Sequence, residues 1–290
     1  MILITGATGL VGSHLALQLL ENGEKLRAIY RNKSSILATK SLFELYEKGY
    51  LFDKIEWIQA DITDIPSLEI AFANVDSVFH CAALISFDPN DEDLLRKTNI
   101  EGTANMVNLS LSNGVKKVGF VSSIAALGRN STEGIVDEEC YFKATKLDSN
   151  YALSKYYAEQ EVWRASQEGL NVVIVNPSVI LGPGDWNKGS SQIFQKIHSG
   201  LKFCHPRPIG AMRPQPKMKG DFQNVVFRQK SSHHPDSLNC VPSQAIMNKN
   251  SLVQWCINSA WLRHEARLAR SHLVRKYLRA LLHQLPRGCH

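Results

Sequence analysis

The chain has 290 residues, of which 44% are hydrophobic and 21% are charged, as in an ordinary soluble globular protein. This length suffices for one large or two small domains. No apolar run approaches the roughly 18 to 20 residues of a transmembrane helix, and the first residues lack the basic segment of a signal peptide, so we expect a cytoplasmic protein.

The net charge of +6 is unevenly distributed along the chain. Residues 204–290 contain 14 of the 33 basic residues but only three of the 27 acidic ones, together with four of the six cysteines and seven of the eleven prolines. Residues 1–203 are therefore net acidic. We predict a folded domain over residues 1–203 and an atypical basic tail over residues 204–290.

The first predicted element is a short buried strand over residues 2–4, and a glycine-rich turn follows it at once. Gly6 permits a tight turn, Gly9 lets backbone N–H groups approach a pyrophosphate, and Gly12 lets the next helix pack against the strand. The N-terminus of that helix would face the phosphates with the positive end of its dipole. An ordinary glycine-rich turn is the alternative, because the spacing differs from the common Gly-x-Gly-x-x-Gly.

The next predicted elements are a helix that ends near Asn22 and a strand over residues 26–30. Arg31 follows this strand, at the position that meets the adenosine ribose in a dinucleotide-binding fold. An acidic residue there would bind the 2′-hydroxyl group of NAD, whereas a basic residue suits the 2′-phosphate of NADP. Arg31 therefore favours NADP over NAD, unless Arg31 and Lys33 are only solvated loop charges.

A helix is predicted over residues 34–50 and a third strand over residues 55–58. Asp61 lies just past this strand, where its carboxylate could accept a hydrogen bond from the adenine amino group while Ile62 packs on the ring. Helix capping is the alternative role, in which Asp61 or Asp64 only caps the helix that follows.

A fourth strand is predicted over residues 75–79, and Cys81, Ala82 and Ala83 lie just beyond it. Small residues at the carboxyl end of a strand let a flat cofactor lie close to the backbone. Cys81 is better explained as a small buried residue than as a nucleophile, because no base is evident at suitable spacing.

A long helix is predicted over residues 91–112, and Gly102 in its middle would permit close packing. The fifth strand covers residues 116–121 and ends in Ser122 and Ser123. A further helix over residues 151–167 and a sixth strand over residues 172–175 complete the pattern. Alternating strands and helices predict an α/β fold, a doubly wound parallel sheet with helices on both faces.

Tyr151 and Lys155 are four residues apart, so they share one face of the predicted helix. A phenol with a pKa of about 10 is a poor base at neutral pH, and a nearby ammonium group lowers that pKa. Tyr151 could then donate a proton to a carbonyl oxygen as hydride reaches the carbon, or remove the proton in the reverse direction. Ser123 could hydrogen-bond the same oxygen. Surface positions on the helix are the alternative for both residues.

The combined pattern resembles the extended short-chain dehydrogenases/reductases, of the NAD-dependent epimerase/dehydratase and dihydroflavonol-reductase-like kind. The resemblance covers residues 1 to about 203. The segments that carry it are residues 5–12, 61–62, 80–83, 99–103, 121–123 with Gly128, 151–155 and 176–177.

This resemblance implies a Rossmann-type fold that binds NAD(P), with Ser123, Tyr151 and Lys155 as the catalytic triad. Ser123 is chosen over Ser122 because the catalytic serine of the family lies five residues before the glycine that matches Gly128. It also implies a homodimer. The cofactor contacts expected on these grounds come from Gly6, Thr8, Gly9, Leu10, Val11, Gly12, Arg31, Asp61, Ile62, Cys81, Ala82, Ala83, Asn99, Ser122, Tyr151, Lys155, Pro177 and Ser178.

The resemblance stops where the composition changes, near Phe203. The family's late strands and helices, which build most of the substrate pocket, have no counterpart in the proline-rich sequence that follows. We hypothesise that residues 204–290 are poorly ordered, or are an out-of-frame translation. Binding of nucleic acid or membrane by this basic tail is a weaker alternative, and its histidines and cysteines lack the spacing of metal ligands.

These patterns predict an NADP-dependent oxidoreductase that interconverts a carbonyl group and a secondary alcohol of a small molecule. A nucleotide-sugar epimerase or dehydratase with tightly bound NAD is the alternative among enzymes. A non-catalytic dinucleotide-binding protein is the alternative from another class, because the substrate half of the family pattern is missing.

Overall fold

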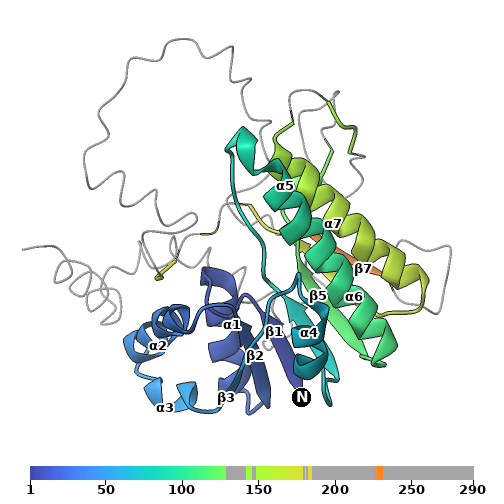
Figure 1. Cartoon of the computed structure of the whole chain (residues 1–290). Coiled ribbons are helices and arrows are strands. Elements are labelled where there is room, and N and C mark those ends of the chain that lie inside the picture. Colours follow the sequence, from blue (N-terminus) through green and yellow to red (C-terminus); the bar gives the residue numbers. More distant parts are fainter. Residues whose placement is uncertain (129–141, 146–147, 179, 181, 185–225, 231–290) are drawn as a thin grey trace, which may run out of the picture.

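The computed structural model describes residues 1–128, 142–145, 148–178, 180, 182–184 and 226–230. Its strands form one seven-stranded sheet in the order β3-β2-β1-β4-β5-β6-β7 (Figure 1). The strands are β1 (Ile2–Thr5), β2 (Leu26–Tyr30), β3 (Ile55–Gln59), β4 (Ser77–His80), β5 (Lys117–Val121), β6 (Val172–Asn176) and β7 (Val226–Lys230).

The first six strands are parallel, and β1 lies at the centre between β2 and β4. Its Ile2 is in register with Leu26 of β2 on one side and with Ser77 of β4 on the other. The predicted doubly wound parallel sheet is therefore confirmed.

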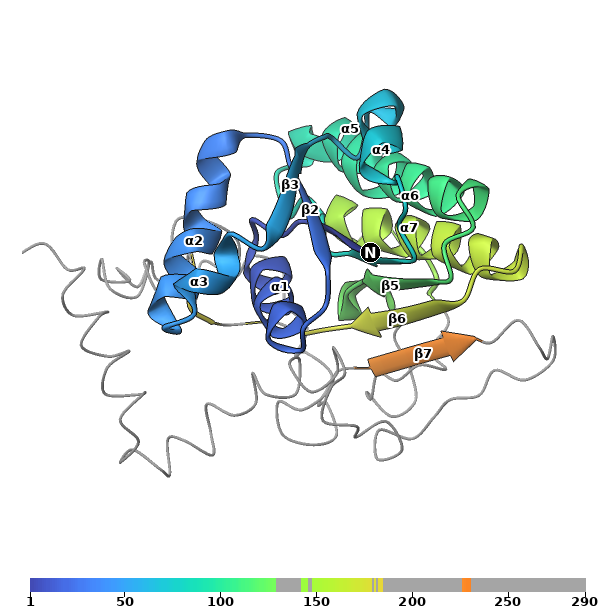
Figure 2. The same cartoon turned by 90° about the horizontal axis from the view of Figure 1, so that it is seen from below.

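The seventh strand, β7, runs antiparallel to β6 at the edge of the sheet (Figure 2). It lies within the predicted tail, where the sequence analysis predicts no strand. The rest of residues 204–290 lies outside the described residues. The boundary at residue 203 and the nature of the tail therefore stay predictions.

Helices connect the parallel strands. They are α1 (Leu10–Glu21), α2 (Ile36–Leu45), α3 (Gly49–Phe52), α4 (Ile65–Ala71), α5 (Glu92–Leu95), α6 (Gly102–Ser112) and α7 (Asn150–Gln167). Shorter segments are the 3₁₀ turns η1 (Lys33–Ser35), η2 (Pro89–Asp91) and η4 (Ile124–Ala126), and the π-helical segment η3 (Arg96–Glu101). In the described part of the chain no helix is both long enough and apolar enough to cross a bilayer.

The helices cover both faces of the sheet, which gives the protein two hydrophobic cores (Figure 2). Leu3 and Ile4 are neighbours in β1, yet they belong to different cores, because successive side chains of a strand point to opposite faces. Leu3 joins the core that includes Val162 of α7, while Ile4 joins the core that includes Leu15 of α1. Burial on both faces explains the apolar character of β1.

Two predicted helices are interrupted in the structure. The helix expected over residues 34–50 is divided into η1, α2 and α3, and Glu47 between α2 and α3 has a positive φ of 60°. The helix expected over residues 91–112 contains the π-helical turn of η3. The prediction of close packing at Gly102 is confirmed, because a Cβ atom there would lie 2.7 Å from Cδ1 of Ile62.

Two smaller predictions also have clear outcomes. The fourth strand is shifted, since β4 covers Ser77–His80 rather than residues 75–79. The capping role belongs to Asp64, whose carboxylate accepts a hydrogen bond from the backbone N–H of Ser67 at 3.3 Å.

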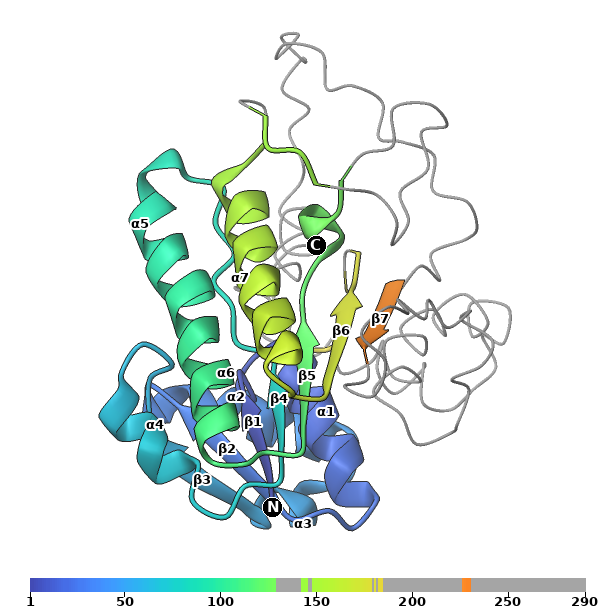
Figure 3. The ribbon, with the colours of Figure 1, turned by 90° about the vertical axis from the view of Figure 1, so that its right-hand side faces the viewer.

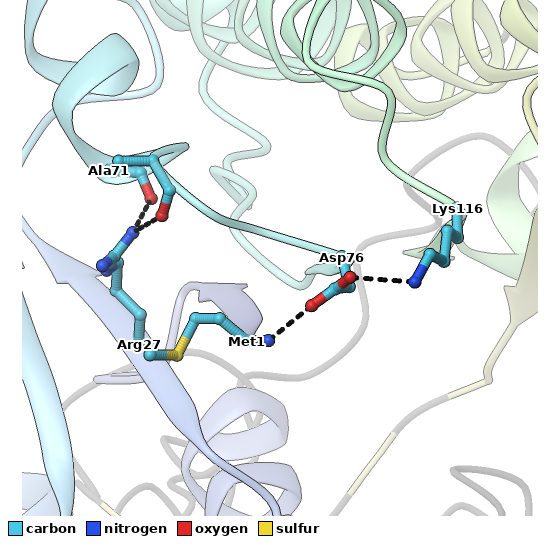
Figure 4. Close-up of polar contacts among 6 residues, drawn as sticks. Met1, Arg27, Ala71, Asp76 and Lys116 are labelled. Carbon is cyan, nitrogen blue, oxygen red and sulfur yellow. Dashed lines mark hydrogen bonds and ion pairs between the residues drawn. The ribbon is translucent and has the colours of Figure 1, made fainter.

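Charged groups tie the strands together at the amino edge of the sheet, where the parallel strands begin (Figure 4). Asp76 lies 2.7 Å from the amino group of Met1 and 3.0 Å from Nζ of Lys116. Arg27 of β2 donates hydrogen bonds to the carbonyl oxygens of Ala71 and Ala73 at 2.9 and 2.6 Å. The contacts of Asp76 join the starts of β1, β4 and β5, and those of Arg27 join β2 to the end of α4, all at the edge opposite the candidate site.

Candidate active site

The carboxyl ends of β1, β4, β5 and β6 meet at one edge of the sheet (Figure 3). The strand order changes direction between β1 and β4, because the chain runs outward from β1 to β3 and then returns to β4. Ligands bind at such switch points in open α/β sheets. The candidate site is built on this edge.

The glycine turn after β1 is closed tightly against the segment that follows β4. Gly6 has a φ of +70°, and its carbonyl oxygen accepts a hydrogen bond from the N–H of Gly9 at 2.9 Å. A Cβ atom on Gly6 would lie only 2.7 Å from the backbone nitrogen of Ala82. That nitrogen donates to the hydroxyl oxygen of Thr5 at 3.1 Å. Glycine is therefore required at this position for two independent reasons.

The N-terminus of α1 fits a pyrophosphate. Gly9 is the N-cap and has no side chain with which to cap the helix, and the first turn, with Leu10 and Val11, contains no acidic residue. A Cβ atom on Gly12 would lie 2.3 Å from the carbonyl oxygen of Gly6, so the helix packs directly on the turn. The first N–H groups of a helix need acceptors, and an anion supplies them.

Arg31 and Asp61 lie together at the ends of β2 and β3. Their side chains are 4.0 Å apart, and Arg31 is largely exposed. Asp61 also accepts hydrogen bonds from the backbone and hydroxyl groups of Thr63 at 2.9 Å. Ile62 is buried and packs on Gly102. A guanidinium group is thus available to an anion at this end of the site.

Asn99 uses its amide to hold the segment that follows β4. Its oxygen accepts a hydrogen bond from the N–H of Leu84 at 2.7 Å, and its nitrogen donates to the carbonyl oxygen of Leu84 at 3.0 Å and to the hydroxyl of Ser154 at 2.8 Å. Asn99 is buried. The contact that it was predicted to make with the cofactor stays a prediction.

Ser123 and Tyr151 meet at the end of β5. The side chain of Ser123 acts on the pKa of the Tyr151 phenol, and the N–H of Ala125 donates a hydrogen bond to the Ser123 oxygen at 3.1 Å. Burial raises the pKa of Tyr151, and the neighbouring side chain of Ser123 opposes that rise. Tyr151 is therefore a protonated phenol at neutral pH. The ring of Phe87 approaches the ring of Tyr151 edge-on, with 5.8 Å between centroids.

Lys155 lies one turn after Tyr151 on α7 and is almost completely buried. Its ammonium group donates to the carbonyl oxygen of Val121 at 2.9 Å and lies 4.4 Å from the centre of the Phe120 ring. Burial lowers the pKa of Lys155 to about 8, while the charges of Glu159 and Cys81 oppose this decrease. The group is therefore still mainly cationic at pH 7.

Residues 2–210 match the sequence profile of the NAD-dependent epimerase/dehydratase family. The chain belongs to this family. It is 34% identical over 182 residues to a protein named putative dihydroflavonol 4-reductase from Synechocystis, with 63% of this chain and 50% of that protein covered. It is 32% identical over 221 residues to cinnamoyl-CoA reductase 1 from Oryza sativa, with 73% and 63% covered.

A crystal structure of a protein named gox2253 has the same fold. It is 35% identical to this chain and superposes with a TM-score of 0.58, and the match covers 69% of this chain and 58% of that one. The chain spans about half to two thirds of the length of the curated relatives that it matches. The family membership predicted from the motifs is confirmed.

Most of the predicted site residues lie along the carboxyl edge of the sheet. The glycine turn, the segment after β4, Ser123, Tyr151 and Lys155 are brought together there. Pro177 follows β6, and its carbonyl oxygen accepts a hydrogen bond from Ile124 at 3.1 Å. Ser178 comes directly after it and is half-buried.

Ser122 hydrogen-bonds to Glu159 of α7. It is buried, and its hydroxyl donates to Oε2 of Glu159 at 2.7 Å. The predicted contact between Ser122 and the cofactor stays a prediction. Of the two adjacent serines, Ser123 is the one whose side chain affects the pKa of Tyr151.

Two residues beside Tyr151 and Lys155 are not predicted from the sequence, namely Phe87 and Glu159. Phe87 lies in an irregular segment and has no motif around it. The spacing of the sequence does contain a signal for Glu159. Tyr151, Lys155 and Glu159 are four residues apart, so the three side chains share one face of a helix.

Proposed function

We propose that the chain is an NADP-dependent reductase that interconverts a carbonyl group and a secondary alcohol of a small molecule. The observation that carries this proposal is the cluster of Ser123, Tyr151 and Lys155 beside the glycine turn. The relatives named dihydroflavonol 4-reductase and cinnamoyl-CoA reductase support reduction over epimerisation.

Each member of the cluster has a chemical role in this proposal. Bound NADPH supplies the hydride that forms the new C–H bond. Ser123 donates a hydrogen bond to the carbonyl oxygen, and Tyr151 transfers its phenolic proton to that oxygen as the C=O π bond breaks. The ammonium group of Lys155 stabilises the phenolate that is left on Tyr151. Because the phenol is protonated and the lysine is cationic at pH 7, the site is poised for reduction.

The cofactor would lie along the carboxyl edge of the sheet. The turn from Gly6 to Gly12 and the start of α1 suit the pyrophosphate, since both leave room and backbone N–H groups for it. Arg31 suits the 2′-phosphate of NADP, since its side chain is largely exposed next to Asp61. The segment from Cys81 to Ala83 brings small residues close to the turn.

The catalytic part of the proposal is tested with Tyr151→Phe. This variant retains affinity for NADPH and loses turnover by about 10²- to 10⁴-fold, because the proton donor is gone. The measurement is the steady-state oxidation of NADPH with a panel of ketones and aldehydes. Tyr157→Phe is the matched control, because Tyr157 lies on the same helix and is exposed. Undiminished turnover in Tyr151→Phe would contradict the assigned role.

The cofactor part is tested by fluorescence titration with NADPH and NADH. Arg31→Ala raises the Kd for NADPH by about tenfold or more and leaves the Kd for NADH nearly unchanged, because only NADPH carries the 2′-phosphate. Lys33→Ala is the control. Tightly held NAD in the purified protein would instead favour an epimerase or dehydratase, and binding without any turnover would favour a non-catalytic protein.

A further inference from the structure

Glu159 is a buried carboxylate directly behind the proposed catalytic residues. It lies on α7, one turn after Lys155 and two turns after Tyr151, and only 2% of its surface is exposed. A charged group at such a position is costly unless other groups are paired with it. The partners of Glu159 therefore indicate what it does.

The partners are hydrogen-bond donors from different parts of the fold. Oε2 accepts from the hydroxyl of Ser122 at 2.7 Å and from the side-chain nitrogen of Asn176 at 2.8 Å. Oε1 accepts from the indole nitrogen of Trp163 at 3.2 Å. An amide N–H and an indole N–H can only donate, so both carboxylate oxygens act as acceptors in these bonds.

These bonds connect the two strand ends that form the site. Ser122 follows β5, and Asn176 is the last residue of β6. The nitrogen of Asn176 also donates to the backbone carbonyl oxygen of Ser123 at 3.0 Å. Asn176 therefore links the carboxylate of Glu159 to the backbone of Ser123. Glu159 lies on α7, the helix that also carries Tyr151.

Glu159 also places negative charge near Lys155. Among the described residues, the titratable groups that interact with Lys155 are His80 of β4, Cys81 after β4 and Glu159 of α7, and Tyr151 lies one turn before Lys155 on the same helix. Burial lowers the pKa of His80 to about 3, so this imidazole is neutral at pH 7. Glu159 and Cys81 both raise the pKa of Lys155, and the effect of Glu159 is the larger.

We propose that Glu159 is the positioning residue of this site: its carboxylate holds the ends of β5 and β6 against α7 and stabilises the ammonium group of Lys155 beside Tyr151. The catalytic consequence rests on the proposed function, whereas the effect on Lys155 does not. The charge of Glu159 raises the pKa of Lys155 against the larger effect of burial. Without it, the lysine would lose its proton at a lower pH.

The test measures the pKa of Lys155 in the full-length chain. The protein is labelled with ¹³C-lysine, and the Cε signal of Lys155, assigned with Lys155→Met, is followed as the pH changes. Glu159→Gln lowers the pKa of Lys155 by about one unit, because the negative charge is lost. The basic limb of the pH profile for carbonyl reduction shifts to lower pH by the same amount, which is about a tenfold loss of rate on that limb.

Trp163→Phe is the matched control. Glutamine at position 159 can still accept from Ser122 and Asn176 through its oxygen, but its amide then faces the indole N–H of Trp163, which is also a donor. Trp163→Phe removes that same bond and keeps the charge of Glu159. We expect the pKa of Lys155 in this variant to equal that of the wild type.

The outcomes separate the proposals. An unchanged pKa of Lys155 in Glu159→Gln, or an equal decrease in Trp163→Phe, would overturn the role of Glu159. Full turnover in Tyr151→Phe would overturn the proposed function alone, because the titration of Lys155 needs no turnover. If Glu159→Gln does not fold, Glu159→Asp is the second test. This variant keeps the negative charge but has a shorter side chain, so we expect kcat to fall while the basic limb of the pH profile stays in place. A wild-type kcat would overturn the positioning role.

Discussion

The two edges of the parallel sheet use charged residues in opposite ways. At the amino edge, Asp76 is half-exposed and pairs with the amino group of Met1 and with Lys116 (Figure 4). At the carboxyl edge, Lys155 and Glu159 are buried almost completely. Exposed pairs contribute little to stability, whereas a buried charge is costly and strongly affects its neighbours. The two edges therefore differ in the burial of their charged groups, with exposed pairs at the amino edge and buried charges at the carboxyl edge.

The pKa values of the charged groups differ between the two edges in the same way. The partners of Asp76 lower its pKa to about 2, which stabilises an ionised surface group. Burial moves the carboxyl-edge groups the other way, away from their charged forms: the pKa of Lys155 falls to about 8 and that of Tyr151 rises. Groups with perturbed pKa values that lie together are typical of active sites.

The largest contrast between the edges is expected from their two lysines. Lys155→Met lowers turnover by about 10²- to 10⁴-fold, because the phenolate of Tyr151 loses its stabilising cation. Lys116→Met at the amino edge leaves turnover unchanged. Within the described residues, the ion-pair partner of Lys116 is the exposed Asp76, at the opposite edge from the candidate site. Steady-state kinetics of both variants measure this difference in turnover. Equal losses of activity in the two variants would contradict the comparison of the two edges.

Two glycines give the second contrast. Gly12→Ala places a Cβ atom 2.3 Å from the carbonyl oxygen of Gly6, so the turn must move. We expect a loss of about 1 to 3 kcal/mol in the free energy of unfolding and a large decrease in affinity for NADPH.

Gly114→Ala is the matched control for Gly12→Ala. Gly114 precedes β5 at the amino edge and has a φ of +65° with no atom within 4 Å of its Cβ position. This variant is destabilised by about 1 to 2 kcal/mol through backbone strain alone and binds NADPH as the wild type does. Denaturant unfolding and fluorescence titration measure the two effects separately. Weakened NADPH binding in Gly114→Ala would contradict the comparison.

The third contrast concerns acid stability. His80 is buried between Thr5 and Thr103, which lie 2.6 and 3.0 Å from its ring nitrogens, and burial lowers its pKa to about 3. The unfolded chain binds a proton near pH 6.5 and the folded protein does not, so stability falls as the pH decreases from about 6.5 to about 3.

His80→Gln isolates this effect. The slope of the unfolding free energy against pH between pH 6 and 4 becomes smaller by about 1.4 kcal/mol per pH unit, which corresponds to one proton. Urea unfolding at a series of pH values measures the slope. The same slope in both proteins would show that His80 is not the group responsible.

Local motifs explain why much of this site was predictable. Gly6, Gly9 and Gly12 are close in sequence, and Tyr151 and Lys155 are one helical turn apart, so their geometry follows from a single turn and a single helix. The partners of Glu159 follow from no such local rule. Ser122 and Asn176 are 37 and 17 residues away, and only the register of β5 with β6 brings them to α7.

The departures from the predicted elements have similar causes. Glu47 adopts a positive φ of 60° and ends a helix without the glycine or asparagine that usually marks this conformation. The strand β7 pairs with β6 across about fifty residues of sequence, so no local pattern connects the two. Periodicity predicts which segments form elements, whereas contacts between distant segments decide where these elements break and pair.

The smallest effect is expected from Asp76→Asn at the amino edge. The pKa of Asp76 is lowered to about 2, so its pairs with Met1 and Lys116 stabilise the protein above about pH 4, and this contribution is lost as the pH falls through 2. The difference in Tm between wild type and variant is therefore present at pH 7 and shrinks toward pH 2. This difference in Tm is smaller than the one caused by Gly114→Ala.

High salt removes the Tm difference caused by Asp76→Asn at pH 7, because 1 M salt reduces the Debye length to about 3 Å. Salt leaves the acid-induced loss at buried His80 nearly unchanged, so a salt-insensitive effect of Asp76→Asn would show that the two edges do not differ as described.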